Sequence, residues 1–231
     1  MSTLSIVATP IGNLEDITLR ALSVLRKADF ILCEDTRVTK RLLNHYEINA
    51  PTISYHAHSQ LSKKEEIVNM LKEGKNLALV SDAGTPGVSD PGMELVRYLR
   101  QELNAEIKDG EIKIDTIPGP SALISAIAIA GVPCSEFVFL GFLPHKKGRE
   151  TLFKEIALSE RTMIFYESTH RIIKTLESLD RHCPNKKVTI CRELTKIYEE
   201  VLSGTANEVK NILESNPEKI KGEFVVLVSD N

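Results

Sequence analysis

Several features that mark particular protein classes are scarce or missing in this chain of 231 residues. Tryptophan is absent and aromatic residues make up only 5% of the sequence. This scarcity argues against a surface that binds RNA by stacking bases on aromatic side chains. The formal net charge is −3, so no overall positive field attracts nucleic acid or a membrane. A polyanionic partner would have to meet a local basic patch.

The cysteine pattern and the hydrophobic runs exclude further classes. The cysteines form no CxxC pair and lack metal-ligand spacing; they are Cys33, Cys134, Cys183 and Cys191. Residues 1–6 lack the basic and apolar segments of a secretory signal. The longest apolar run, residues 122–132, is interrupted by Ser125 and Gly131 and is too short to cross a bilayer. We therefore expect a cytoplasmic protein with reduced thiols, no membrane span and no metal.

Neither common nucleotide fingerprint is present, yet one loop is unusually rich in glycine and proline. There is no GxxxxGK[ST] motif and no GxGxxG motif. Residues 81–92, SDAGTPGVSDPG, hold three glycines and two prolines, which restrict the path of the backbone. The loop follows the apolar run 77–80 and precedes the helical pattern 93–103. Open α/β sheets bind ligands in loops at the carboxyl ends of their strands.

The order of hydrophobic patterns predicts an α/β fold with two domains. Apolar strand patterns at residues 4–8, 29–33, 52–55 and 76–80 alternate with helical patterns, which is typical of a mostly parallel β/α unit. From Phe137 the pattern favours a mixed sheet with helices. We place an N-terminal α/β domain at residues 1–117 and a C-terminal α/β domain at 118–231. The dipeptide Asp109-Gly110 predicts a small hairpin between strands at 105–107 and 111–116.

Three proline-containing turns follow predicted strands, at residues 9–13, 81–92 and 118–121. If their strands are parallel neighbours, all three turns lie at one edge of the sheet. They would then present backbone N–H and C=O groups to an adenosine-like ligand. The alternative is that each turn is only a tight connection.

Polar groups also follow other apolar strands. Residues 34–37, Glu-Asp-Thr-Arg, offer a carboxylate that could act as a general base. Alternatively, Asp35 or Thr36 is the N-cap of the next helix.

The pair His56 and His58 lacks a third metal ligand nearby, so an RNA contact or a plain surface role is favoured. The basic loop at residues 142–149 could contact the phosphate groups of a polyanion. Segments 166–171 and 191–196 again place polar groups directly after apolar strands. This repetition argues for a cleft along one sheet edge.

These stretches together resemble the ribosomal RNA small subunit methyltransferase I family, within the tetrapyrrole methylase superfamily. The resemblance runs from Ala8 to Glu223 and is carried by ATPIGNLEDITLRAL, CEDTR, LVSDAGTPGVSDPG, IPGPSA, GFLP, FYESTHR, RELTK and KGE. It implies two α/β domains of tetrapyrrole-methylase type, with S-adenosylmethionine in a cleft between them, and a homodimer. It also implies methyl transfer to the ribose 2′-hydroxyl of a cytidine in the decoding region of 16S ribosomal RNA of the small subunit.

The resemblance assigns roles to individual residues. The residues implied to bind S-adenosylmethionine are Pro10, Asp82, Ala83, Gly84, Val88, Ser121, Ala122 and Tyr166. Asp35 lies at the superfamily's position for a catalytic carboxylate. From the chemistry of methyl transfer, Asp35 or Glu34 could accept the proton and Arg37, Lys196 or Arg171 could stabilise the alkoxide, and the sequence does not choose among them. The expected RNA contacts are Lys146, Lys147, Arg149, Arg171 and Lys196.

Two other functions stay open. A methyltransferase of the same superfamily could act on a tetrapyrrole or another small molecule, although the FYESTHR and RELTK stretches argue against it. A non-catalytic ribosome-binding protein could retain the cofactor pocket without transferring a methyl group.

Overall fold

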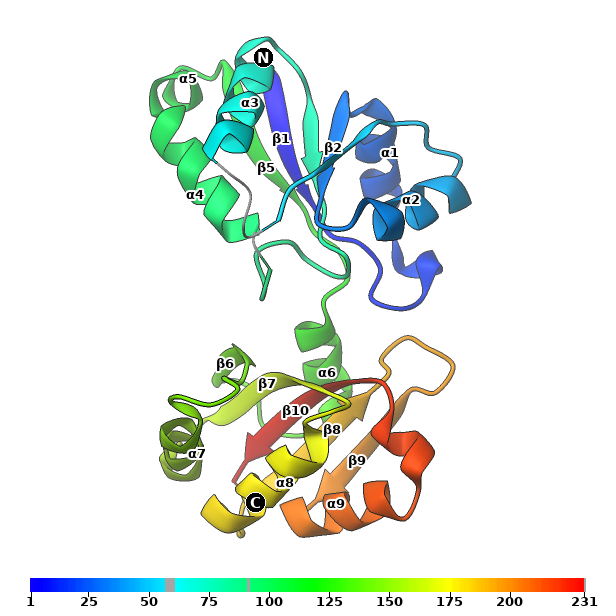
Figure 1. The fold of residues 1–231 in the computed structure, drawn as a ribbon, viewed down its shortest axis with the longest axis vertical. Coiled ribbons are helices and arrows are strands. Elements are labelled where there is room, and N and C mark those ends of the chain that lie inside the picture. The colour runs from blue at the N-terminus through cyan, green and yellow to red at the C-terminus, as the bar shows by residue number, and fades with distance from the viewer. Residues whose placement is uncertain (57–60, 91, 231) are drawn as a thin grey trace. The chain divides into compact units, whose positions relative to one another are not determined.

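The structure is a computed structural model that describes residues 1–56, 61–90 and 92–230 (Figure 1). The chain divides into two compact units, Met1–Ser121 and Ala122–Asn231. Each unit is an α/β layered structure with its own five-stranded sheet. The predicted fold class is confirmed. No helix in the described part of the chain is long and apolar enough to span a membrane.

The sheet of the first unit is parallel throughout, as the strand–helix alternation predicts. Its strands run in the order β3-β2-β4-β1-β5. They are β1 (Ser2–Val7), β2 (Phe30–Cys33), β3 (Thr52–Ser54), β4 (Leu77–Leu79) and β5 (Ile112–Ile117). The helices are η1 (Leu14–Asp16), α1 (Leu19–Lys27), α2 (Thr36–His45), α3 (Leu61–Lys72), α4 (Gly92–Glu102) and α5 (Asn104–Lys108).

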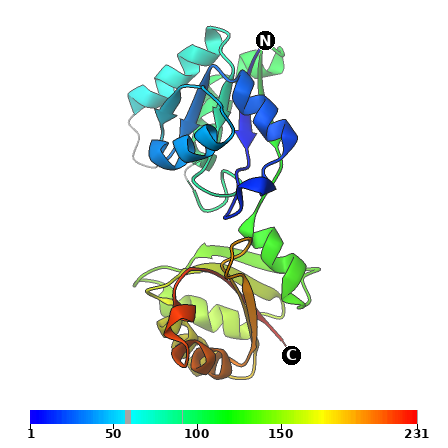
Figure 2. The same cartoon turned by 90° about the vertical axis from the view of Figure 1, so that its right-hand side faces the viewer.

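Alternation along the strands explains why both faces of this sheet are covered. Ile31 and Cys33 pack with the apolar residues of α1 and α2, whereas Leu32 between them packs with those of α3 and α4. Successive side chains of a strand point to opposite faces, so a continuous apolar strand fills two cores. Figures 1 and 2 show the resulting helix layers on both sides of the sheet.

The predicted hairpin around Asp109-Gly110 is wrong. Residues 105–107 belong to the helix α5, and β5 pairs in parallel with β1 instead. The Asp109 N–H donates to the Ala105 carbonyl, and Gly110 has a φ of +76°. A glycine in the left-handed region commonly ends a helix. The same Asp-Gly pair that suits a hairpin turn therefore serves here as a helix C-terminus.

The sheet of the second unit is mixed, as predicted. It runs in the order β6-β7-β10-β8-β9, with β6 and β7 parallel and the other neighbours antiparallel. The strands are β6 (Phe137–Phe142), β7 (Thr162–Ser168), β8 (Lys187–Arg192), β9 (Glu200–Gly204) and β10 (Glu223–Ser229). The helices are α6 (Ala122–Ala130), α7 (Arg149–Leu158), α8 (Ile172–His182), α9 (Ala206–Glu214) and η2 (Pro217–Ile220).

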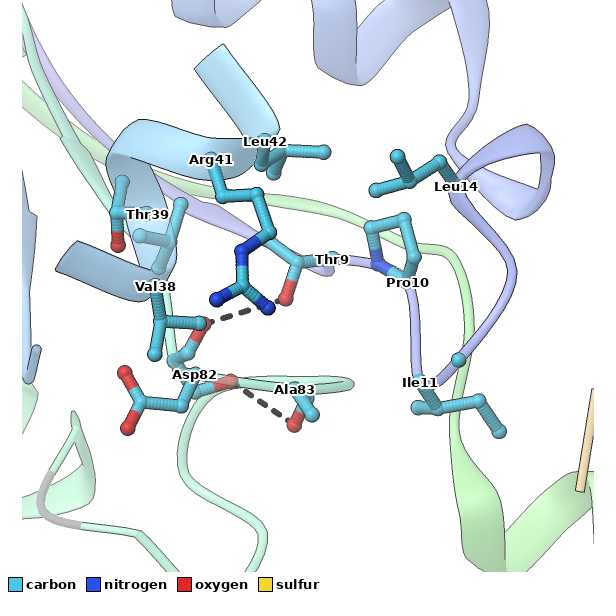
Figure 3. Close-up of a pocket in the computed structure, with 13 residues that line it drawn as sticks. Thr9, Pro10, Ile11, Leu14, Val38, Thr39, Arg41, Leu42, Asp82 and Ala83 are labelled. Atoms are coloured by element: carbon cyan, nitrogen blue, oxygen red, sulfur yellow. Dashed lines mark hydrogen bonds between the residues drawn. The ribbon is translucent and has the colours of Figure 1, made fainter. Parts of the chain in front are cut away.

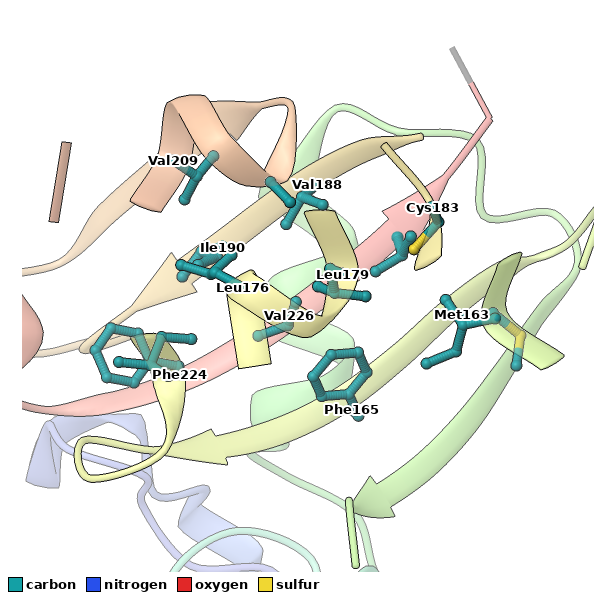
Figure 4. Close-up of a cluster of buried hydrophobic side chains, with 14 of the residues drawn as sticks. Met163, Phe165, Leu176, Leu179, Cys183, Val188, Ile190, Val209, Phe224 and Val226 are labelled. Carbon is teal, nitrogen blue, oxygen red and sulfur yellow. The ribbon is translucent and has the colours of Figure 1, made fainter. Parts of the chain in front are cut away.

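The main core of this unit lies between one face of the sheet and the helices α7, α8 and α9 (Figure 4). Phe165 and Ile190 are fully buried there. The small-residue helix α6 packs against β8 and β10 from the other face, where the Cys191 thiol lies 3.8 Å from the Ala126 carbonyl oxygen. Burial raises the pKa of Cys191 to about 12 and that of Cys183 to about 11. These free thiols are structural and unreactive.

Candidate functional site

Three loops meet at the carboxyl edge of the first sheet. Strand β1 lies between β4 and β5, and all three are parallel, so their following loops lie at one edge, as predicted. The Thr9 N–H donates to the Gly84 carbonyl at 2.9 Å, and the Gly84 N–H donates back to the Thr9 carbonyl at 3.1 Å. The Thr85 hydroxyl donates to the Pro120 carbonyl at 3.0 Å. Loops 9–13, 81–92 and 118–121 therefore form one connected backbone surface.

The loop 81–92 needs its glycines. Gly84 has a φ of +82°, and a Cβ there would lie 3.3 Å from Ile11 Cγ2. The position of Gly84 thus favours glycine because of its positive φ, and it lies where the loop from β4 approaches the loop from β1 so closely that a Cβ would press on Ile11. The Asp90 carboxylate accepts the N–H groups of Gly87 and Gly92, each at 2.7 Å, and so fastens the loop to the start of α4. Asp90 thus caps the first turn of α4.

A pocket of about 340 Å³ opens beside these loops, within the first unit (Figure 3). Pro10, Asp82 and Ala83, all predicted cofactor residues, line it. The wall opposite is formed by α2, which we did not assign to the site from sequence. Val38, Arg41 and Leu42 face the pocket from that helix. Their i, i+3, i+4 spacing is the signal that could have identified this face.

The remaining predicted cofactor residues are divided between the two units. Val88 lies in the loop 81–92, where its N–H donates to the Thr85 carbonyl. Ser121 is the last residue of the first unit, and Ala122 begins α6 in the second. In the second unit the Tyr166 hydroxyl accepts the Leu123 N–H at 3.2 Å. Contact of these residues with a cofactor stays a prediction.

Asp35 caps α2 and is paired with Arg37. One carboxylate oxygen accepts the Arg37 backbone N–H at 2.8 Å, and the guanidinium donates to both oxygens, at distances from 2.6 to 3.2 Å. These hydrogen bonds lower the pKa of Asp35 to about 2. The N-cap interpretation is confirmed. A carboxylate with so low a pKa is a weak proton acceptor.

Glu34, the neighbouring carboxylate, is in a different environment. Partial burial raises its pKa, and the nearby carboxylates of Asp82 and Asp90 raise it further. Glu34 lines a small hollow together with Tyr55 and Asp90. The Asp82 carboxylate accepts the Asp35 N–H at 3.1 Å, which ties the loop 81–92 to the end of β2. Of the two adjacent carboxylates, Glu34 is the better proton acceptor.

The polar segments of the second unit also lie at one sheet edge. Strands β7 and β8 both run antiparallel to β10, and β6 runs parallel to β7. The segments that follow β6, β7 and β8 therefore share an edge with the start of β10. This confirms their expected repetition along one edge. Lys146 and Lys147 are exposed in the loop between β6 and α7.

The other three predicted RNA contacts are engaged in internal ion pairs. The side chains of Arg149 and Arg171 are only 14% and 16% exposed, and both approach the buried carboxylate of Glu167. The Lys196 ammonium pairs with Glu193 and Glu223, each at 2.9 Å. RNA contact by these residues stays a prediction.

The histidine pair falls partly outside the described residues, because His58 lies in the segment 57–60. Within residues 1–56, 61–90 and 92–230, no group of three or more histidine, cysteine, aspartate or glutamate side chains could hold a metal ion.

Comparison with known proteins identifies the family. Residues 3–210 match the family described as Tetrapyrrole (Corrin/Porphyrin) Methylases. The chain belongs to this family. A ribosomal RNA small subunit methyltransferase I of Halalkalibacterium halodurans is 46% identical over 99% of this chain and 76% of its own length. The protein of the same name from Thermotoga maritima is 44% identical over 99% of both chains. Within the family, the chain therefore groups with proteins of that name.

Solved structures of distant relatives have the same fold. The methyltransferase CobJ superposes with a TM-score of 0.69 at 21% identity, covering 100% of this chain and 95% of its own. A uroporphyrin-III C-methyltransferase from Thermus thermophilus, solved with S-adenosyl homocysteine, gives a TM-score of 0.62 at 17% identity over 98% of this chain and 97% of its own. S-adenosyl homocysteine is the demethylated product of S-adenosylmethionine, which is the cofactor of this family.

Proposed function

We propose that this protein transfers a methyl group from S-adenosylmethionine to the ribose 2′-hydroxyl of a cytidine in the decoding region of small-subunit ribosomal RNA. The proposal of an RNA substrate rests on one observation. Over 99% of its length, the chain is 46% and 44% identical to two proteins that are named for methylating that RNA. The solved structures are only 21% and 17% identical to this chain, so they support the fold alone.

The first unit suits the cofactor because its loops offer backbone rather than charged side chains. The backbone surface around Gly84, where a Cβ would take up part of the space, fits a ligand that is recognised by backbone N–H and C=O groups. We assign its binding to Pro10, Asp82, Ala83, Gly84, Val88, Ser121, Ala122 and Tyr166. Arg41 adds a cation to the pocket wall that suits the carboxylate of the cofactor's methionine part. When bound, the cofactor supplies an electrophilic methyl group on a sulfonium and leaves as a neutral thioether.

The protein's own contribution to the chemistry is alignment and proton removal. A ribose hydroxyl is a weak nucleophile and needs a base. We assign that role to Glu34, since its pKa is raised whereas that of Asp35 is about 2. Asp35 and Arg37 act together at the start of α2, where the guanidinium can stabilise developing negative charge.

The substrate is held, in this proposal, by the basic loop of the second unit. Lys146 and Lys147 are exposed, and phosphate contacts by lysine make RNA binding dependent on salt. A homodimer is part of the proposal, and sedimentation equilibrium of the full chain tests it.

The decisive experiment uses small ribosomal subunits from cells that lack this activity. They are incubated with the protein and labelled S-adenosylmethionine, and the methylated nucleotide is mapped. Label on the 2′-oxygen of one decoding-region cytidine is the expected result. Label at another position or on a base would correct the site of transfer. Cofactor binding without any label would favour the non-catalytic ribosome-binding alternative, and label in an added tetrapyrrole would favour the small-molecule alternative.

A further inference from the structure

Glu167, near the end of β7, is a fully buried carboxylate with an unusual number of partners. Its side chain is 0% exposed. One oxygen accepts the Ser168 N–H at 2.9 Å and lies 3.1 Å from the Arg171 Nε. The other accepts the Thr175 hydroxyl at 2.6 Å and lies 3.9 Å from the Arg149 Nη1. The reaction proposed above gives this carboxylate no part.

The two guanidiniums link Glu167 to the loop that carries the exposed lysines. Arg171 Nη2 donates to the Leu143 carbonyl at 2.6 Å, and Arg149 Nη1 donates to the Pro144 carbonyl at 3.4 Å. Arg149 Nη2 also donates to the Thr175 hydroxyl at 2.7 Å. The backbone of the loop is thus held at the residues directly before His145, Lys146 and Lys147.

The far end of the same loop is fixed as well. The Arg149 N–H donates to the Lys146 carbonyl at 3.2 Å, and Gly148 caps α7 with a φ of +85°. The Leu143 and Pro144 carbonyls are therefore held at the N-terminal end of the loop, and a hydrogen-bonded turn closes its C-terminal end. The exposed side chains of this loop are those of His145, Lys146 and Lys147.

The charge balance makes the carboxylate indispensable to this arrangement. Two arginines and one glutamate leave one net positive charge in a buried cluster. Without the carboxylate, two guanidiniums would be buried close together without the counterion that they share, which is strongly unfavourable. They would turn towards solvent and release the Leu143 and Pro144 carbonyls.

We infer that Glu167 is a positioning residue for RNA binding: through Arg149 and Arg171 it holds the loop 143–148 so that Lys146 and Lys147 are fixed in advance for contact with phosphates. Fixing a loop before binding reduces the entropic cost of ordering it on association. This inference rests on the proposed function, since it takes the bound polyanion to be small-subunit ribosomal RNA.

The first test is a double-mutant cycle on binding to unmethylated small ribosomal subunits. In the wild-type background, replacing Lys146 and Lys147 with alanine is expected to weaken binding about 5- to 10-fold, from modest individual charge contacts. It should also reduce the magnitude of the salt slope by about 0.7 to 0.9 for each phosphate that a lysine no longer neutralises. In a Glu167→Gln background, the same pair of substitutions should change affinity less than about twofold, because the lysines are no longer held in place. Equal effects in both backgrounds would overturn the inference.

Matched variants separate positioning from general damage. Glu136→Gln breaks an exposed ion pair with Arg161 at the opposite edge of the same sheet, and it should leave RNA affinity unchanged. Alanine at Lys75 and Lys108, which are exposed before β4 and β5 in the other unit, removes the same charge away from the loop. If Glu167→Gln fails to fold, Arg171→Lys replaces it. Lysine keeps the charge but lacks the planar guanidinium, whose Nε lies against Glu167 while its Nη2 donates to the Leu143 carbonyl.

The second test needs no RNA and stands even if the substrate proposal fails. Hydrogen exchange of the free protein is followed at residues 143–149. Glu167→Gln is expected to increase exchange there at least tenfold, while the lysine double variant leaves it unchanged. Unchanged exchange in Glu167→Gln would overturn the positioning role itself. Increased exchange, together with no binding of small subunits by the wild-type protein, would keep the positioning role and reject the RNA partner.

Discussion

Replacing Gly84 with valine tests the cofactor site most directly. Gly84 has a φ of +82° and lies where the loops from β1 and β4 meet. A β-branched residue with positive φ is a conformational outlier. Its Cβ would already lie 3.3 Å from Ile11 Cγ2, and the two γ-methyls of valine extend beyond that. The loop must therefore move away from the first loop.

The size of the effect follows from the strain and from the hydrogen bonds that the movement would break. Backbone strain of this kind costs about 1–3 kcal/mol. The two hydrogen bonds between Thr9 and Gly84 contribute roughly 1 kcal/mol each. If both contributions are lost when the loop moves out of its binding position, cofactor binding becomes weaker by about 3–5 kcal/mol. That corresponds to a decrease in affinity between about 150-fold and several thousandfold.

The assay is isothermal titration with S-adenosylmethionine, paired with thermal unfolding. Gly110→Ala is the matched control, because Gly110 also has a positive φ, of +76°, but a Cβ there meets nothing within 4 Å. It should lower stability by about 1–2 kcal/mol from strain alone and leave the cofactor affinity unchanged. A folded Gly84→Val protein with wild-type affinity would refute the assignment of this loop to the cofactor.

The remaining predictions concern the carboxylates and the core. Glu34→Gln should reduce kcat by about 10²–10⁴-fold, as expected for loss of a general base. Because burial and neighbouring carboxylates raise the pKa of Glu34, wild-type activity should fall as the pH drops through that raised value, and the variant should lack this acid limb; an identical pH profile would contradict the role. Asp35→Asn should change kcat much less than Glu34→Gln and leave the unfolding midpoint nearly unchanged, since asparagine also caps helices. A larger loss of kcat would return the base to Asp35. Phe165→Ala, at a fully buried site, should cost about 3–5 kcal/mol in urea unfolding, and a cost under about 1 kcal/mol would show that the core is packed differently.

Much of the fold could be predicted because the patterns that specify it are local. Apolar runs such as 29–33 and helical patterns such as 93–103 identify their elements without knowledge of their neighbours. The prediction of a hairpin at Asp109-Gly110 was wrong because it, too, rested on a local pattern alone. Its two residues suit both a hairpin turn and a helix end, and only the pairing of β5 with β1 decides between them.

The candidate site was predicted in part. The gathering of three loops at one edge follows from parallel strands, whereas the family resemblance is what assigned Pro10, Asp82 and Ala83 to the cofactor. The contribution of α2 was not proposed, although the spacing of Val38, Arg41 and Leu42 was visible. The helix α2 lines the pocket because of the way it packs on the sheet. The residue pattern within the helix does not predict that packing.

By itself, the sequence determined the class of fold, the edge of each sheet at which polar segments gather, and the family to which the chain belongs. Only the tertiary structure decided what each charged group at those edges is able to do. It pairs Asp35 with Arg37, partly buries Glu34 near Asp82 and Asp90, and places Arg149 and Arg171 around Glu167. The physical reason is that ionisation and exposure depend on neighbours brought close by folding, such as Leu143 and Arg171, which are 28 residues apart in the chain and joined by a hydrogen bond of 2.6 Å.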